Sequence, residues 1–131
     1  MAKFSKREKL CNKKLIDELF TEGKAFLFYP FLITFLITNI PGKYPIQLLL
    51  HVSKKVHKKA VKRNFIKRLI RESYRLNKLE LYNYLSKCNL NLIISINYIG
   101  KEIKCFEIIN DKMKELLNLL QYEFKKKSLL Q

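Results

Sequence analysis

Acidic residues are scarce in this 131-residue chain, which has 11 Asp or Glu against 27 Lys or Arg and a formal net charge of +16 at pH 7. Glycine and proline number only three each, so we expect few and short loops. The three cysteines, Cys11, Cys88 and Cys105, are odd in number and lack metal-ligand spacing, which favours free thiols in a reducing cytoplasm. Residues 25–40 carry no charge, but these 16 residues are fewer than the roughly 20 that a membrane-spanning helix needs, and a buried strand fits them better.

Apolar residues are plentiful by contrast, at 48% of the chain, and they include nine Phe and seven Tyr. This composition excludes a disordered basic tail and predicts one domain over residues 1–131 with a single core. Residues 1–11 are either a flexible basic arm or the start of a short extra turn, because Ser5 and Glu8 have the spacing of a capping box.

The positive charge is concentrated in residues 54–78, which hold 11 Lys or Arg and one acid, Glu72, and so carry +10 of the total. Four of the five arginines of the chain lie there, between residues 63 and 75. Self-repulsion of this size opposes compaction, and a solvated helix face would need more acids to balance it. Guanidinium groups bind phosphate with two hydrogen bonds and stack on bases, so the segment indicates a nucleic-acid partner.

Hydrophobic periodicity predicts an α-β-β-α-β-α order, an α+β two-layer sandwich with a small sheet. We expect helices over 13–22, 58–77 and 105–126, a short helix or helical turn over 79–86, and strands over 31–38, 46–53 and 90–98. Asn12 suits the N-cap of the first helix, and Gly23 suits its C-terminal end. The strands at 31–38 and 46–53 are separated by a turn, which predicts an antiparallel hairpin.

The basic helix at 58–77 has two faces on a helical wheel. The predicted core side consists of Val61, Phe65, Ile66, Leu69, Ser73 and Leu76. The predicted ligand side consists of Arg63, Asn64, Lys67, Arg68, Arg71 and Arg75. Lys58, Lys59 and Lys62 lie at the positive end of the helix dipole without a good N-cap, an unfavourable arrangement that suits a bound phosphate.

No protein-based catalytic constellation and no metal site is predicted. The only histidines, His51 and His57, flank the segment Val52–Val56. Either could act as a general base, but His51 alternates with Leu50 and Val52 in a strand, which favours a polar residue lining a groove.

The segment Val52-Ser-Lys-Lys, followed by AVKRNFIKRLIRE from Ala60, resembles the bacterial ribonuclease P protein family. The family pattern is Val-Ser/Pro-Lys-Lys, then Ala-Val-x-Arg-Asn-Arg-x-Lys-Arg-x-x-Arg-Glu. Leu19-Phe20-x-x-Gly23 also matches, and the resemblance covers nearly the whole chain. It implies a left-handed crossover that carries the basic helix between parallel strands.

The resemblance further implies a cytoplasmic subunit of a ribozyme that removes the 5′ leader of precursor tRNA. The RNA subunit and substrate would hold the catalytic Mg²⁺, and the protein would bind the RNA subunit and the leader and help the holoenzyme to hold metal ions. No membrane and no obligate protein partner is implied.

Two sets of site residues follow from the resemblance. The RNA-binding set is Lys54, Lys55, Lys58, Lys59, Arg63, Asn64, Lys67, Arg68, Arg71 and Arg75. The leader-cleft set is Ile16, Phe20, Leu32, Thr34, His51 and Ser53. Without the resemblance, ordinary core is the favoured interpretation of Ile16, Phe20 and Leu32, and Thr34 and Ser53 are ordinary strand residues.

The chain departs from the family pattern at four positions. Phe65 replaces an Arg and is predicted to face the core, which removes one RNA contact. Thr34 replaces a frequent aromatic residue, and Leu49 and His51 replace smaller residues of the cleft floor. A second hypothesis is a non-enzymatic RNA-binding module, such as a ribosome-associated protein. A membrane-surface helix is disfavoured, because the apolar face is narrow and the chain has no Trp.

Overall fold

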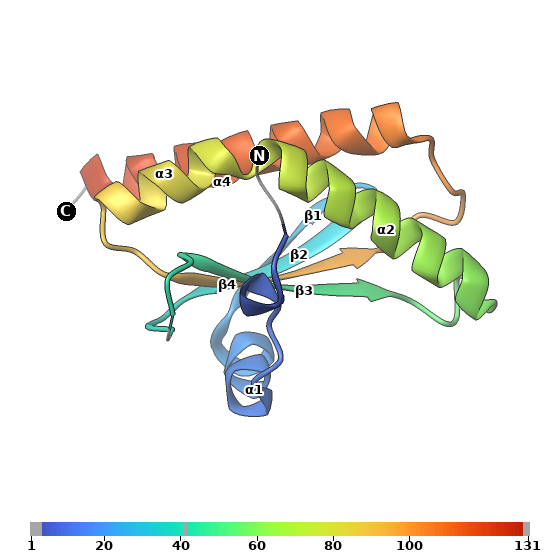
Figure 1. Cartoon of the computed structure of the whole chain (residues 1–131), viewed down its shortest axis with the longest axis horizontal. Helices are drawn as coiled ribbons and strands as arrows, with labels where there is room; N and C mark the ends of the chain where they lie inside the picture. Colours follow the sequence, from blue (N-terminus) through green and yellow to red (C-terminus); the bar gives the residue numbers. More distant parts are fainter. Residues whose placement is uncertain (1–3, 41, 130–131) are drawn as a thin grey trace.

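The computed structural model describes residues 4–40 and 42–129, which form a four-stranded sheet with helices on both faces. Figure 1 shows α2, α3 and α4 above the sheet and α1 alone below it. The strands are β1 (Lys24–Phe28), β2 (Phe31–Ile37), β3 (Ile46–Val52) and β4 (Leu92–Tyr98). The helices are a 3₁₀ turn, η1 (Lys6–Glu8), and α1 (Lys13–Glu22), α2 (Ala60–Asn77), α3 (Leu79–Lys87) and α4 (Phe106–Leu129).

The strand order in the sheet is β1-β2-β4-β3. β2 lies between β1 and β4 and is antiparallel to both, whereas β3 pairs in parallel with β4. The predicted hairpin between the strands at 31–38 and 46–53 is therefore wrong, because β4 lies between them. The hairpin partner of β2 is β1, which was not predicted as a separate strand. The β3–α2–α3–β4 connection is the expected crossover between parallel strands, and its left hand stays a prediction.

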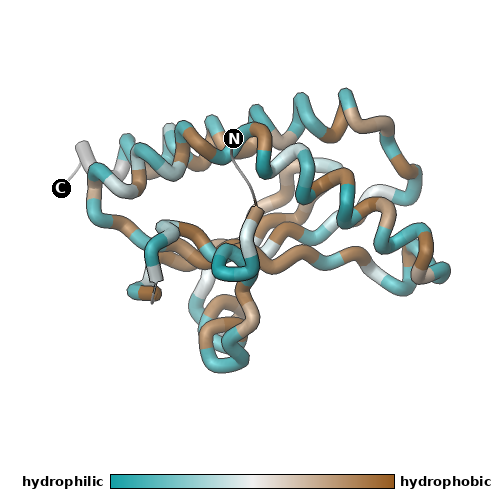
Figure 2. Tube along the Cα trace, viewed as in Figure 1, coloured by the Kyte–Doolittle hydropathy of each residue, from teal (hydrophilic) through white to brown (hydrophobic). Residues whose placement is uncertain are grey.

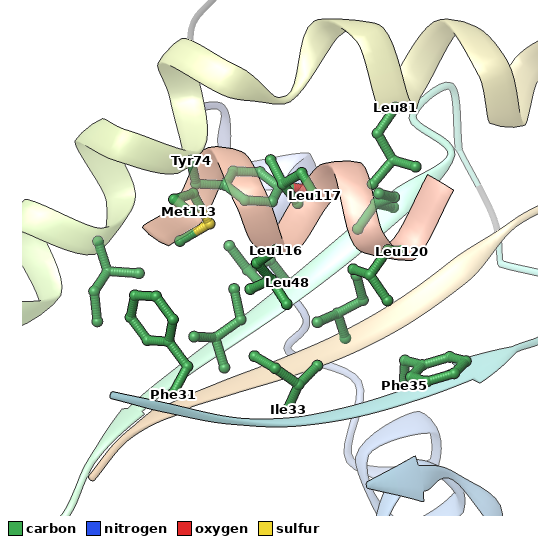
Figure 3. Close-up of a cluster of buried hydrophobic side chains, with 14 of the residues drawn as sticks. Phe31, Ile33, Phe35, Leu48, Tyr74, Leu81, Met113, Leu116, Leu117 and Leu120 are labelled. Atoms are coloured by element: carbon green, nitrogen blue, oxygen red, sulfur yellow. The ribbon is translucent and has the colours of Figure 1, made fainter. Parts of the chain in front are cut away.

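The main core fills the space between the sheet and the upper helices (Figure 3). Alternate residues of the strands point into it, among them Phe31, Ile33 and Phe35 of β2. The apolar stripe of α4 faces them with Met113 and Leu116. Figure 2 shows the matching pattern, with hydrophobic colour along the strands and alternating colours along the helices.

Helix α2 docks on this core with a face that matches the predicted one only in part: Ile66 and Ser73 are buried as predicted, and Leu69 packs against the core. Its buried residues are Ile66, Ile70, Ser73 and Tyr74. Val61, Phe65 and Leu76, which were assigned to the core side, are 80%, 47% and 51% exposed. The helix is rotated relative to the expectation because Ile70 and Tyr74 point into the core, and Tyr74 is the larger anchor.

Helix α1 has the predicted bounds. The Asn12 side-chain oxygen accepts hydrogen bonds from the backbone N–H groups of Lys14 and Leu15, at 3.0 and 3.3 Å, which confirms the N-cap. Gly23 ends the helix in an extended conformation with φ −71°. A Cβ at this position would lie 2.2 Å from the carbonyl oxygen of Leu19, so glycine is required by close approach.

The N-terminal segment, residues 4–11, is anchored by a buried polar network. The Glu8 carboxylate is fully buried and accepts hydrogen bonds from Ser5 N–H at 2.6 Å and from the Tyr82 hydroxyl at 2.8 Å. It also forms an ion pair with Lys78, whose exposed fraction is 4%. Burial raises the pKa values of the Tyr74 and Tyr82 hydroxyls, which are hydrogen-bonded to each other. The extra-turn interpretation of this segment is therefore the one that the structure shows.

This network holds the N-terminal segment against the outer edge of β3. There Lys9 forms a parallel bridge to Leu48, and the Leu10 N–H donates to the Leu48 carbonyl oxygen at 2.9 Å. Within residues 4–40 and 42–129, no helix is long and apolar enough to cross a membrane.

Candidate nucleic-acid interface

The lower face of the sheet is only partly covered by α1. Leu19 packs there with Leu10, Ile40 and Ile93 in a second, smaller core. Beside this core the sheet is hollowed into a cleft of about 390 Å³. The cleft is lined by Phe20, Leu32, Thr34, Leu49, Leu50, His51, Ser95 and Asn97.

The cleft combines an aromatic wall with an uncharged polar floor. The Phe20 ring is 58% exposed at the end of α1. Thr34, Ser95 and Asn97 supply hydroxyl and amide groups, and the Asn97 side-chain oxygen is buried without a hydrogen-bond partner in the described chain. None of the lining residues is a carboxylate. An exposed ring for stacking and neutral donors and acceptors for base edges are the features that bind single-stranded RNA.

Four of the six predicted cleft residues meet here, namely Phe20, Leu32, Thr34 and His51. Ile16 packs against the small core under α1 and is not part of the lining. Ser53 lies beyond the end of β3, where its hydroxyl accepts from Lys55 N–H at 3.2 Å and its carbonyl accepts from His57 N–H at 2.9 Å. Ser53 therefore shapes the turn that leads to α2.

Ser95, Asn97 and Leu50 line the cleft but were not among the predicted cleft residues. Ser95 and Asn97 alternate with the core residues Ile94 and Ile96 along β4, so both polar side chains point to the lower face. This period-two pattern was a usable signal within a strand that was otherwise classed as buried. Leu49 and His51, two of the departures from the family pattern, do lie in the cleft.

The turn before α2 is held rigidly. His57 is buried, and its Nε2 lies 2.8 Å from the carbonyl oxygen of Gly100, which can only accept, so Nε2 carries the hydrogen. A general-base role for His57 has no support in this geometry. The Arg63 guanidinium donates to the carbonyl oxygens of His57 and Lys58, at 3.0 and 2.7 Å. Arg63 thus fixes the turn that presents Lys54, Lys55, Lys58 and Lys59, all of them exposed.

The start of α2 has no side-chain cap, as expected, and Lys59 is at the N-cap position. Further along, Asn64 and Arg68 are exposed, and Lys67 and Arg71 are half-buried. Arg75 forms an ion pair with Glu72, and its side-chain hydrogen bond lowers the pKa of that carboxyl. The Lys78 ammonium forms an ion pair with the Glu8 carboxylate inside the protein. The last part of the basic segment is therefore internally paired. The earlier part is directed outward except at Arg63, whose guanidinium is bonded to the turn before α2.

A second groove, which we call the edge groove, connects the cleft to α2. It has a volume of about 270 Å³ and is lined by Phe4, Lys9, Leu10, Cys11, Leu48, Leu49, Leu50, Lys67 and Arg71. Leu49 and Leu50 line both hollows. The cleft, the edge of β3 and the cations of α2 therefore form one continuous surface. In the described chain, no group of three or more His, Cys, Asp or Glu could hold a metal ion.

Comparison with known proteins gives a consistent result. A family model described as ribonuclease P matches residues 4–121. The ribonuclease P protein component of Porphyromonas gingivalis is 34% identical over 113 residues, covering 86% of this chain and 82% of the relative. That of Chlorobium phaeobacteroides is 32% identical over 126 residues, covering 86% and 84%.

Solved structures agree on the fold. The RNase P protein from Thermotoga maritima superposes with a TM-score of 0.64 at 28% identity, covering 88% of this chain and 97% of that one. The Staphylococcus aureus RNase P protein, at 20% identity, shares the fold with a TM-score of 0.63 over 86% of this chain and 94% of that one.

Proposed function

This chain belongs to the ribonuclease P protein family, and on that premise we propose that it binds the 5′ leader of precursor tRNA in the cleft while α2 binds the catalytic RNA subunit. It is a subunit of the ribonuclease P holoenzyme, an endoribonuclease. The proposal assigns bond cleavage and its Mg²⁺ to the RNA subunit and substrate, in the cytoplasm. The protein contributes binding and orientation.

The observation that carries the proposal is the continuity between a neutral cleft and a cationic helix. A single strand in the cleft would stack a base on Phe20 and meet hydroxyl and amide groups on the floor. Lys67 and Arg71 in the adjoining edge groove would neutralise phosphates. A substrate that is single-stranded at one end and docked against another RNA fits both parts at once.

Reconstitution tests this function. The purified chain is added to a bacterial ribonuclease P RNA and precursor tRNAs that carry leaders of increasing length. We expect leader removal at low Mg²⁺ that requires the protein, and an affinity that rises with leader length. RNA binding without any effect on cleavage across a Mg²⁺ series would favour a non-enzymatic RNA-binding module instead.

The electrostatic contribution of α2 to RNA binding is measured separately, from the salt dependence of the RNA affinity. With about six phosphate contacts, the slope of log K against log salt is expected near −4 to −5. A flat salt response would contradict the role given to α2.

A further inference from the structure

Phe65 lies on the outward side of α2 although it is a large aromatic residue. It is 47% exposed, and Val61, one turn earlier, is 80% exposed. The side of the helix that enters the core carries Ile66 and Ile70 instead. Single exposed apolar residues are common, so exposure alone does not define a binding site. The neighbours of Phe65 make this position unusual.

Cations flank the ring on both sides. Lys62 and Arg68 are three residues before and after Phe65, a spacing that makes side chains neighbours on a helix surface. Both are exposed, and neither forms an ion pair with a carboxylate of the described chain. The acid one turn beyond Arg68, Glu72, is engaged by Arg75. The surface of Val61, Lys62, Phe65 and Arg68 therefore has an apolar aromatic centre with unbalanced positive charge around it.

This combination selects a polyanion that also has flat apolar faces. A protein partner would need acidic side chains placed around an apolar side chain to match this surface. In RNA, every nucleotide already carries a flat base and a negatively charged phosphate. Stacking of a base on an aromatic side chain tolerates any base, because every base has a π-face. Lys and Arg beside the ring supply the phosphate contacts.

We propose that Phe65 stacks on an unpaired base of the catalytic RNA subunit, while Lys62 and Arg68 hold the flanking phosphates. The inference rests on the proposed function, because it names a contact of the same RNA partner. It also revises the meaning of the departure from the family pattern: the position has exchanged a charged contact for a stacking contact.

Affinity measurements with the RNA subunit test the stacking contact. Phe65→Ala is expected to weaken binding by about 5- to 150-fold, the range that the loss of one base–aromatic stack produces. Phe65→Leu retains apolar bulk without a ring and should weaken binding similarly, whereas Phe65→Trp should retain affinity. The slope of log K against log salt should stay at the wild-type value in all three. Lys62→Ala or Arg68→Ala should instead reduce its magnitude by about 0.7 to 0.9.

Leu76→Ala is the matched control, because Leu76 is similarly exposed on the same helix and lies outside this surface. It should bind like wild type. Equal affinity of Phe65→Ala, Phe65→Leu and wild type would overturn the proposal, as would a loss in Phe65→Leu no larger than in Leu76→Ala. Thermal melts of each variant identify any loss of affinity that comes from unfolding.

Fluorescence gives an independent readout, because the natural chain has no tryptophan. Phe65→Trp introduces a single reporter, and stacking on a base should quench its emission when the RNA subunit is added. Leu76→Trp is the control and should change little. Equal responses of the two variants would contradict stacking. Cleavage by the wild-type protein is measured in parallel: if wild type stimulates leader removal and both Phe65→Ala and Phe65→Leu match it in affinity, only the stacking contact fails.

Discussion

Removal of the buried Glu8 carboxylate should be among the most damaging single changes in this protein. Glu8→Leu leaves the Lys78 ammonium, at 4% exposure, without this carboxylate in the interior. Loss of one partner of a buried ion pair costs about 3–5 kcal/mol, because the other charge stays desolvated. A domain of this size has about 5–15 kcal/mol of stability in total, so the variant should lose roughly a fifth of it or more.

A double variant that removes both charges tests the same prediction more strictly. Glu8→Leu with Lys78→Met removes both charges and leaves Tyr82 hydrogen-bonded to Tyr74 at 2.7 Å. Its cost should be well below the sum of the two single variants, with a coupling energy of about 2 kcal/mol or more. The exposed pair of Lys112 and Glu115 is the control, and Glu115→Leu should change stability by no more than about 1 kcal/mol.

Urea unfolding followed by far-ultraviolet circular dichroism measures these free energies. The midpoint of thermal unfolding of Glu8→Leu should fall by roughly 10–20 °C. Additive costs in the double variant, or a loss below about 1 kcal/mol in Glu8→Leu, would refute the argument that the pair is charged and desolvated.

Three further substitutions separate binding from stability. Arg68→Ala should weaken binding to the RNA subunit and reduce the magnitude of the salt slope by about 0.7 to 0.9 with an unchanged melt, and an unchanged slope would show that Arg68 contacts no phosphate. Phe20→Ala should abolish the gain in precursor affinity that longer leaders give, while the melt stays near wild type because the ring is mostly exposed; a large loss of stability would make it a core residue. Asn12→Ala should cost about 1 kcal/mol, since it removes the acceptor for two N–H groups, and RNA affinity measured on the folded protein should not change.

The sequence predicted correctly those helices and strands that are marked by residues within or next to the element itself. The ends of α1 follow from Asn12 and Gly23, and the family assignment follows from the motif in α2. Strand β1 was missed because residues 25–40 are uncharged throughout, and only the turn at Pro30 divides them. The placement of β4 between β2 and β3 was missed because no short-range signal reports pairing between strands that are more than 40 residues apart.

The cleft was predicted in part for the same reason. Phe20, Leu32, Thr34 and His51 were identified through the family resemblance, whereas Asn97 needed the register of β4 against β2. The core face of α2 was predicted correctly at Ile66 and Ser73, but Ile70 and Tyr74 were missed because the apolar residues Val61 and Phe65, at the exposed start of the helix, shifted the predicted apolar face away from them. The ion pair of Glu8 with Lys78 joins residues 70 positions apart, so the sequence around either residue does not predict it.

The bridge between Lys9 and Leu48 bears on the behaviour of shortened chains. An open strand edge offers unpaired N–H and C=O groups to any other strand, and aggregation begins at such edges. Here the N-terminal segment occupies part of the edge of β3 itself. Deletion of the first ten residues would uncover that edge beside the leucines of the edge groove, Leu48, Leu49 and Leu50. Such a shortened protein should self-associate once its charge is screened by salt or by bound RNA.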